Sequence, residues 1–233
     1  MKVIIDRARL ARRARLSHAA SLGGLLAILG SVALTMFRPD LATPGAFLLV
    51  AGFAAATIGT AQANRWVKRP RPEEILDQAL KGLDDHYRLY HYRQGAPPHL
   101  LLTPSDLVVI ECRVGEGLYR FDNGRWSQKM TLGKAVRFFV EEPLGDPQRE
   151  AQRTAQQLAE ALRQRLPDDV SVPVRSVVVF THPAAIVDAE GASIPVFQPK
   201  QLRRHAARTA RPLSAETYAA VRTLLDVGAP PGT

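Results

Sequence analysis

Two long uncharged runs dominate the hydropathy pattern of the first third of the chain, at residues 18–37 and 45–63. A short polar stretch, residues 38–44, separates them. An α-helix rises about 1.5 Å per residue, so about twenty residues cross a hydrocarbon core of roughly 30 Å. Each run has about that length, and the pattern therefore predicts two transmembrane helices joined by a short loop.

After Pro72 the apolar positions follow shorter periods, and turn residues separate the segments. Asp146 and Pro147 are typical of the first residues of a helix, and Asn123-Gly124 is typical of a hairpin turn. Residues 177–180 are continuously apolar, as in a strand covered on both faces. The predicted elements are a helix from Pro72, a strand at 87–92, hairpins at 99–102/107–114 and 118–121/125–129, a helix from Asp146, strands at 177–180 and 194–197, and helices at 201–210 and from Ser214.

This order predicts an α/β domain in which helices flank a mixed central sheet. We divide the chain into a basic N-terminal arm (1–17), a transmembrane hairpin (18–63), a basic linker (64–71), a cytoplasmic domain (72–226) and a flexible tail (227–233). Small residues at Ala55, Gly59 and Ala63 offer the second membrane helix a face for close packing against the first.

The net charge of +9, from 31 Lys and Arg against 22 Asp and Glu, first suggests a nucleic-acid partner. Its distribution changes that interpretation. Residues 1–16 carry +5, residues 64–71 carry +4, and the rest of the chain has no net charge. Because all nine charges flank the apolar region, they are better explained by membrane topology than by nucleic-acid binding.

Basic residues outside both ends of the hairpin place the N-terminus and the C-terminal domain on the cytoplasmic side. We therefore expect a two-pass integral membrane protein with a lipid bilayer as partner, in a prokaryotic plasma membrane. Trp66 lies where an interfacial anchor would be expected. A cleaved signal peptide is disfavoured, because the first apolar run exceeds the usual length and a second span follows it. The N-terminal arm remains open between an interfacial helix and a loose topogenic tail.

Candidate chemistry is sparse. On the strand at 107–114, alternation places Glu111 and Arg113 on one face and Cys112 on the apolar face, as a core thiol. A carboxylate beside a cation suits a metal and phosphate site, but a solvated ion pair on an edge strand has the same pattern. The six histidines lack metal-ligand spacing and fit ordinary structural roles, and one Cys excludes an internal disulfide.

Several common motifs are absent from the sequence, including the P-loop, the dinucleotide fingerprint and G-x-S-x-G. A basic cluster lies near the predicted helix at 201–210. It is suited to phosphate or anionic lipid, although a solvated helix face is the commoner explanation of such a cluster. The cluster consists of Arg203, Arg204, Arg208 and Arg211.

The order of elements from Pro72 to Arg211, with Glu73 opening a helix, the hairpin at 99–113, Gly117, Trp126 and the Asp-Pro helix start, resembles the nuclease-related domain (NERD) family. The resemblance implies a restriction endonuclease-like α/β fold. Such enzymes use a helix Glu, a strand Asp and a Glu-x-Lys pair, whose carboxylates hold Mg²⁺ while the Lys assists the nucleophile.

Transferred to this chain, the resemblance makes Glu73 the helix glutamate and Glu111 the first residue of Glu-x-Lys, so that Glu73, Glu111 and Arg113 are the catalytic candidates and the two glutamates are the Mg²⁺ ligands. Two positions depart from the family pattern. Pro98 occupies the Asp position and has no metal-binding atom, and Arg113 replaces the Lys with a bulkier cation that stays protonated.

Three functions follow as hypotheses. The first is a non-catalytic, membrane-tethered module that binds nucleic acid or a protein at the inner membrane surface. The second is a Mg²⁺-dependent endonuclease that uses Glu73 and Glu111, and the third is a scaffold in a membrane assembly. About nine residues separate Ala63 from Glu73, so in all three the domain lies close to the headgroups.

Overall fold

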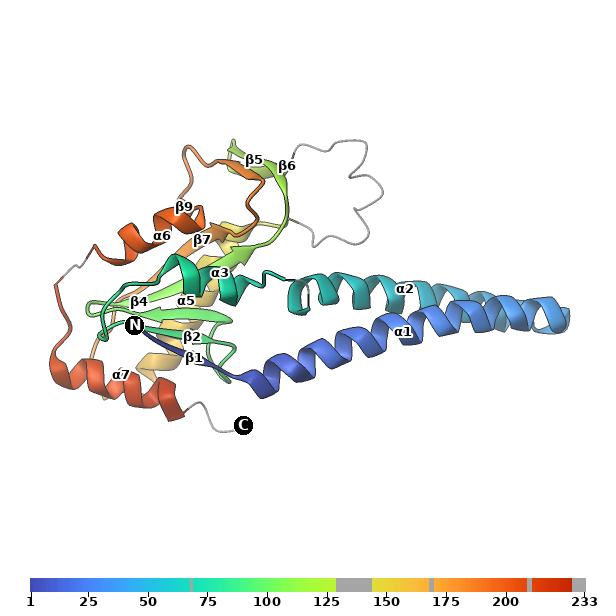
Figure 1. The fold of residues 1–233 in the computed structure, drawn as a ribbon, viewed down its shortest axis with the longest axis horizontal. Helices are drawn as coiled ribbons and strands as arrows, with labels where there is room; N and C mark the ends of the chain where they lie inside the picture. The colour runs from blue at the N-terminus through green and yellow to red at the C-terminus, as the bar shows by residue number, and fades with distance from the viewer. Residues whose placement is uncertain (68, 129–143, 168–169, 209–210, 228–233) are drawn as a thin grey trace. The chain divides into compact units, whose positions relative to one another are not determined.

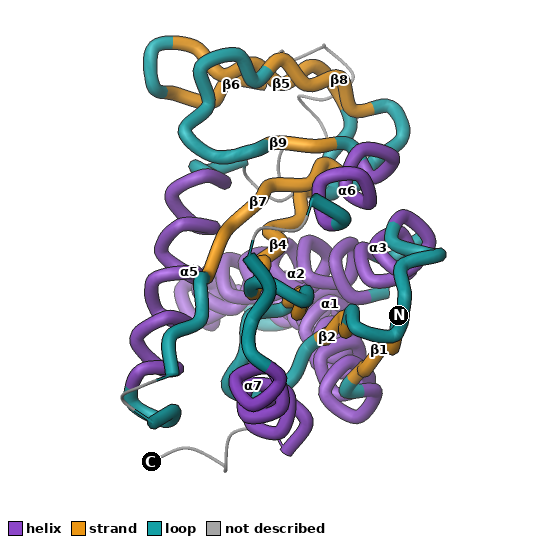
Figure 2. The backbone as a smooth tube through the Cα atoms, turned by 90° about the vertical axis from the view of Figure 1, so that its left-hand side faces the viewer, coloured by secondary structure: helices purple, strands orange, loops and turns teal. Residues whose placement is uncertain are grey.

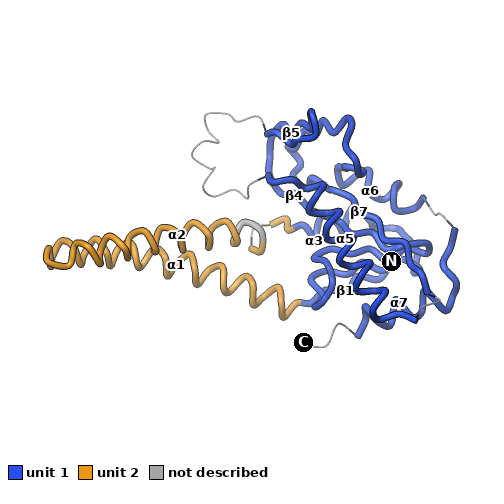
Figure 3. Tube along the Cα trace, turned by 180° about the vertical axis from the view of Figure 1, so that it is seen from behind, with its two compact units in different colours: residues 1–6, 72–129, 144–233 blue, residues 7–71, 130–143 orange. Residues whose placement is uncertain are grey.

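The computed structural model describes residues 1–67, 69–128, 144–167, 170–208 and 211–227. They form two compact units (Figure 3). Residues Met1–Asp6 and the described residues from Pro72 onward make an α/β unit, and Arg7–Arg71 make a helical unit. The chain thus leaves the α/β unit after six residues and returns to it at Pro72.

Figure 1 shows the elements in chain order. The helical unit contains α1 (Arg7–Phe37), the 3₁₀ turn η1 (Pro39–Leu41) and α2 (Ala42–Trp66). The α/β unit contains β1 (Lys2–Ile5), α3 (Pro72–Ala79), β2 (Arg88–His91), β3 (His99–Leu102), β4 (Leu107–Arg113), β5 (Gly117–Asp122), β6 (Arg125–Gln128), α5 (Pro147–Arg163), β7 (Val174–Phe180), β8 (Ala185–Asp188), β9 (Val196–Phe197), α6 (Pro199–Ala206) and α7 (Ala215–Val227).

The two helices of the helical unit meet along small residues that recur every seven positions. A seven-residue repeat keeps one seam facing the partner helix and favours a left-handed crossing. At this seam, a Cβ added to Gly24 would lie 2.3 Å from the Ala56 nitrogen, so the backbones are in close contact. The buried positions of the repeat are Leu10, Ser17, Gly24 and Ser31 on α1, and Gly45, Gly52, Gly59 and Trp66 on α2.

The predicted packing face of α2 is correct at Gly59, where an added Cβ would lie 2.3 Å from the Ser21 nitrogen. Ala55 and Ala63 are half-buried beside the seam rather than at its centre. The glycines of α2 that line the seam are seven residues apart in the sequence. The predicted face used small residues four residues apart and therefore did not include the other glycines of the seam.

The outer faces of α1 and α2 carry exposed large apolar side chains, among them Leu26, Phe37 and Phe53. Two helices, α1 and the segment Pro39–Ala63, are long and apolar enough to cross a membrane. Between them, Arg38 donates two hydrogen bonds to Asp40, at 3.0 and 2.9 Å. The charges of this connecting turn therefore neutralise one another.

The α/β unit is built on a six-stranded mixed sheet with the order β1-β2-β3-β4-β7-β9. β3 runs antiparallel to both β2 and β4, whereas β1, β2, β4, β7 and β9 share one direction. These five strands therefore end at the same edge of the sheet, which we call the carboxyl edge. The mixed sheet flanked by helices confirms the predicted α/β class.

Helices cover both faces of this sheet (Figure 2). α3 and α6 pack on the face that carries Val108, Ile110 and Cys112. α5 and α7 pack on the opposite face, which carries Leu107 and Val109. Cys112 is buried in the first of these cores, as alternation along the strand predicts.

The predicted hairpin at Asn123-Gly124 forms, with Asn123 at φ 49° and Gly124 at φ 77°. Its strands do not join the main sheet but make a separate sheet with the order β6-β5-β8. Trp126 of β6 packs against Phe180 of β7, with ring centroids 5.6 Å apart. This aromatic contact links the small sheet to the end of the large one.

The first strand was not predicted. Residues 2–5 pair in parallel with β2, and the Asp6 nitrogen donates to the His91 carbonyl oxygen at 3.2 Å. The expectation of an interfacial helix or loose tail is therefore wrong for these residues, and the helix begins at Arg7. Val3-Ile4-Ile5 has the β-branched composition of a strand, but the partner strand lies more than eighty residues away in the sequence.

Candidate functional site

Three of the predicted site positions, Pro98, Glu111 and Arg113, lie at the carboxyl edge of the sheet, near the start of β3 and the end of β4. β3 and β4 are paired up to Leu100 and Val109. Continuing this antiparallel register by two residues brings Pro98 opposite Glu111. Pro98 therefore occupies the place from which a carboxylate could join Glu111 in a metal site, and its side chain offers no ligand atom.

Arg113 is enclosed by hydrogen-bond acceptors. Its Nη1 donates to Glu111, its Nη2 donates to Glu150 Oε2 of α5 at 2.7 Å, and its Nε donates to the Leu144 carbonyl at 3.3 Å. The Arg113 side chain is 6% exposed and that of Glu111 is 13% exposed. Charge-assisted bonds of this kind are among the stronger hydrogen bonds in proteins.

This geometry decides between the two explanations that Glu111 and Arg113 allowed. β4 lies between β3 and β7, so it is an interior strand, and the solvated ion pair of an edge strand is the wrong description. Burial weakens screening by water, and each charge depends on its partner. Arg113 stays protonated, because an arginine keeps its proton in proteins, and it holds Glu111 in an internal ion pair.

Glu73, the other predicted ligand, lies in the first turn of α3 and is 2% exposed. It accepts a hydrogen bond from the Tyr92 hydroxyl at 2.8 Å. α3 packs on the Val108 face of the sheet, whereas Arg113 reaches α5 on the opposite face. The two glutamates thus have different partners, Tyr92 for Glu73 and Arg113 for Glu111.

These residues do not fit a Mg²⁺ site. Magnesium requires oxygen ligands in near-octahedral geometry, usually from one or two carboxylates held together. Glu111 is engaged by Arg113, and Glu73 is engaged by Tyr92. Pro98 has no side-chain oxygen, and its carbonyl oxygen accepts from the Tyr92 nitrogen at 2.8 Å. Among the residues that the structure describes, His, Cys, Asp and Glu form no group of three or more suited to a metal ion.

A chain of three side chains, two buried histidines and the partly exposed Asp77, lies beside Glu73. His91 is fully buried, its Nε2 lies 3.0 Å from Asp77 Oδ1, and its Nδ1 lies 2.8 Å from His99 Nδ1. When Asp77 is ionised it can only accept, so His91 carries its proton on Nε2. The His91 Nδ1 then accepts from His99 Nδ1–H. Asp77 thereby selects the tautomers of both rings.

The histidines were expected to have ordinary structural roles in separate elements, and this expectation missed the pair. His91 and His99 are direct neighbours in the β2–β3 register. The Tyr92 ring also packs edge-on against His99, with centroids 5.1 Å apart. Both strands were predicted, and pairing them as a hairpin would have brought the two histidines together. The position next to Pro98 is thus filled by a buried aromatic and imidazole cluster.

The chain enters and leaves the helical unit beside this cluster. Asp6, the last residue before α1, is bonded to His91, and Pro72 immediately precedes Glu73. Within the α/β unit, Asp6 is therefore bonded to His91, and Pro72 is next to Glu73, which Tyr92 binds.

The basic cluster predicted near residues 201–210 lies on and after α6. Its members Arg204 and Arg208, and the neighbouring Lys200, are exposed, and within the described residues they form no ion pair. On the buried side, Arg175 donates to Asp106 at 2.5 Å and lies 3.1 Å from His205 Nε2. Burial, with Arg175 and Arg208, lowers the pKa of His205. Neutral His205 can therefore accept from Arg175.

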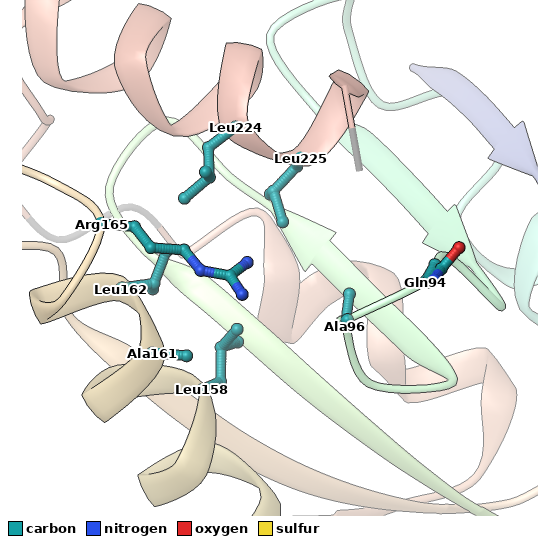
Figure 4. Close-up of a pocket in the computed structure, with 9 residues that line it drawn as sticks. Gln94, Ala96, Leu158, Ala161, Leu162, Arg165, Leu224 and Leu225 are labelled. Atoms are coloured by element: carbon teal, nitrogen blue, oxygen red, sulfur yellow. The ribbon is translucent and has the colours of Figure 1, made fainter. Parts of the chain in front are cut away.

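Figure 4 shows a pocket between α5, α7 and the loop after β2. Its volume of about 20 Å³ leaves room for about one water molecule. Leu158, Leu162 and Leu225 form much of its wall, with Arg165 at its side. A space this small cannot enclose a substrate, and it does not contain the predicted site residues.

The α/β unit thus combines a six-stranded mixed sheet with a polar edge between β3 and β4. Residues 68–181 match the family model of the nuclease-related domain, NERD. This match supports the predicted family over the core of the unit, from α3 to the end of β7. Comparisons with curated proteins and with solved structures found no significant match.

Proposed function

We propose that this protein is a membrane-anchored, non-catalytic NERD-like module that binds a nucleic acid or a protein partner at the membrane surface. The observation that carries the proposal is Arg113 held between Glu111 and Glu150. An internal cation takes the place in which a nuclease would present carboxylates to a metal and a lysine to the nucleophile.

Three features act together against hydrolysis. The guanidinium neutralises Glu111, Pro98 leaves the neighbouring position without an oxygen ligand, and Tyr92 engages Glu73. Arg113 cannot release a proton to act as a base. The alternative of a Mg²⁺-dependent endonuclease would require the ion pair to open and both glutamates to turn toward one ion, at the cost of an unpaired buried cation.

Membrane anchoring rests on the two apolar helices and on the way the chain connects them. Met1–Asp6 and the described chain from Pro72 belong to one folded unit, which supports a topology with both ends of the helical unit on the same side of a membrane. The basic residues at those ends favour the cytoplasmic side. Two crossings joined by a short turn satisfy this condition, whereas a single crossing does not.

The catalytic part of the proposal is tested with the full chain in detergent, since a fragment beginning at Pro72 would lack β1 of the sheet. Labelled single- and double-stranded DNA and RNA are incubated with Mg²⁺ or Mn²⁺. We expect no cleavage above that of a Glu111→Gln control. Metal-dependent cleavage that disappears in Glu111→Gln would overturn the proposal.

A second variant tests whether the two positions that differ from the family pattern, Pro98 and Arg113, prevent metal binding. Pro98→Asp with Arg113→Lys restores the family residue types, and calorimetry with Mn²⁺ then measures metal binding directly. We expect weak binding to appear in the double variant and not in the natural chain. Tight, Glu111-dependent binding by the natural chain would favour the nuclease alternative.

Partner and anchoring require separate measurements. Photo-crosslinking in membranes, followed by nuclease or protease digestion, distinguishes a nucleic-acid partner from a protein neighbour. Protein neighbours alone would favour the scaffold alternative. Resistance to alkaline extraction is expected if α1 and α2 span the bilayer, and release of the chain into the supernatant would contradict anchoring.

A further inference from the structure

The helical unit carries its charge at one end. Arg7–Arg71 contain ten Lys and Arg and a single acidic residue, Asp40. Arg38 and Asp40 pair with each other at the connecting turn. In the sequence, the other nine basic residues fall before the first apolar run, within residues 7–15, and after the second one, within residues 65–71.

On α1 these residues surround the helix. At 100° per residue they fall at about 0°, 80°, 140°, 200° and 240° around the axis. The gap at about 300° belongs to Leu10, which is buried. The basic ring, as we call these residues, consists of Arg7, Arg9, Arg12, Arg13 and Arg15.

The ring is also close to the apolar run along the same continuous helix. From Arg7 to Arg15 it extends about 12 Å along the axis, and the uncharged run begins at the next residue. A headgroup layer is about 5–8 Å thick on each side of the hydrocarbon core. When the apolar run spans the core, the ring therefore crosses the headgroup layer and its aqueous border.

Arg7, Arg12 and Arg15 are exposed, and within the described residues they have no ion-pair partner. The Arg13 guanidinium lies over the indole of Trp66 on α2, 5.5 Å from the indole centroid. This contact places one arginine against the second helix and leaves its neighbours directed outward. A guanidinium can bind two phosphate oxygens at once, which suits it to phospholipid headgroups.

We propose that the basic ring of α1 binds the phosphate groups of anionic phospholipids and selects them over zwitterionic ones. This inference rests on the membrane anchoring proposed above. A lipid surface fits better than a nucleic acid, because lipids can contact every side of a spanning helix that does not pack against α2, whereas a nucleic-acid strand would contact one side of the basic ring. Cations near an anionic surface strengthen membrane association several-fold each.

The test uses the full chain in phosphatidylcholine vesicles that contain trace spin-labelled phosphatidylglycerol or spin-labelled phosphatidylcholine. Electron spin resonance gives the relative association of the two lipids with the protein. We expect phosphatidylglycerol to be preferred about fivefold at low salt and the preference to fall below about twofold in 1 M NaCl. The triple variant Arg7→Gln, Arg12→Gln, Arg15→Gln should show the same reduced preference at low salt.

The matched control removes three exposed cations from the other unit, as Lys200→Gln, Arg204→Gln, Arg208→Gln. It should keep the preference of the natural chain. No preference in the natural chain, or an equal loss in both triple variants, would overturn the inference. A chain that stays outside the vesicles would contradict the anchoring itself, so the two failures are distinguishable. Preference lost in the ring variant alone supports the assignment.

Discussion

The two units of this protein use charge in opposite ways. The α/β unit contains equal numbers of basic and acidic residues, and its enclosed arginines have partners, as with Arg88 and Asp226 at 2.7 Å or Arg113 and Glu150. The helical unit has nine more basic than acidic residues, and several of these are exposed without an acidic partner in the described part of the chain.

The contrast extends to packing. The α/β unit buries large apolar side chains in two cores, one on each face of the sheet. The helical unit brings two backbones together over glycine and serine and leaves its large apolar side chains exposed. Removal of apolar surface from water drives the first kind of packing, whereas close backbone contact over small residues characterises the second. The two units therefore pack through different kinds of contact.

Each unit has one of the two tryptophans, Trp126 in the α/β unit and Trp66 in the helical unit. Single-tryptophan variants of the full chain in detergent, Trp66→Phe or Trp126→Phe, therefore report the unfolding of each unit separately by fluorescence. The predictions below use this pair of reporters to test whether the units respond independently.

The largest effect is expected from Arg113→Ala, followed by Trp126 fluorescence during denaturant unfolding. The substitution leaves Glu111 buried without its cation and should lower the free energy of unfolding by about 3 kcal/mol. The exposed pair Arg120–Asp188 provides the control, and Arg120→Ala should cost less than about 1 kcal/mol. Equal effects of the two substitutions would contradict the assignment of Arg113 to a buried ion pair.

The next effect belongs to the helical unit. Gly24→Leu would force a side chain into the Ala56 backbone and should destabilise the helix pair by about 2 kcal/mol, measured with Trp66. Its neighbour Gly23 has no atom within 4 Å of an added Cβ, so Gly23→Leu should be nearly neutral. Trp126 should report no change in either variant. Disruption by Gly23→Leu as well would show that the seam is placed wrongly.

A smaller effect is expected at the start of α5. The Asp146 carboxylate accepts from the Arg149 nitrogen at 3.1 Å, and Asp146→Ala removes this cap at a cost of about 1 kcal/mol to the α/β unit. Asp146→Asn keeps an oxygen at the same place and should recover most of the loss. If alanine and asparagine behave alike in the Trp126 reporter, capping is not the source of stability at this residue.

The smallest effect concerns pH. Burial and the nearby Arg175 lower the pKa of His205 in the folded unit, so the unfolded chain binds its proton more readily. Neutral His205 therefore contributes fully to the stability of the folded unit above about pH 6.5, the pKa of an unfolded histidine. This contribution decreases as the pH falls through the lower pKa of His205 in the folded unit. His205→Gln should reduce the fall in Tm between pH 7.5 and pH 5, and exposed His86→Gln should not. An unchanged pH dependence in His205→Gln would contradict this account.

Much of the α/β unit was accessible to sequence reasoning because its signals are local. The Asp146–Pro147 helix start, the Asn123–Gly124 turn and the hairpin around residues 103–106 all formed as predicted. Such signals depend on backbone conformations that a few neighbouring residues determine. The NERD resemblance also followed from their order and is supported by the match at residues 68–181.

The candidate site was predicted only in part. Glu111 and Arg113 were placed on one face by alternation, and their pairing followed from that. Glu150 was not anticipated, because α5 meets β4 through tertiary packing alone. The His91–His99 contact also depends on which strand pairs with which. When two segments are far apart in the sequence, the residue spacing within each segment does not show that they contact one another.

By itself, the sequence determined the two apolar helices, the end at which their charge lies and the α/β order of elements. These follow from composition and short-range periodicity. Tertiary structure alone decided that residues 2–5 add a strand to the sheet, that Arg113 donates to Glu150, and that Glu73 accepts from Tyr92. The reason is physical: strand pairing and buried ion pairs gain their free energy from partners that meet only when the whole chain folds.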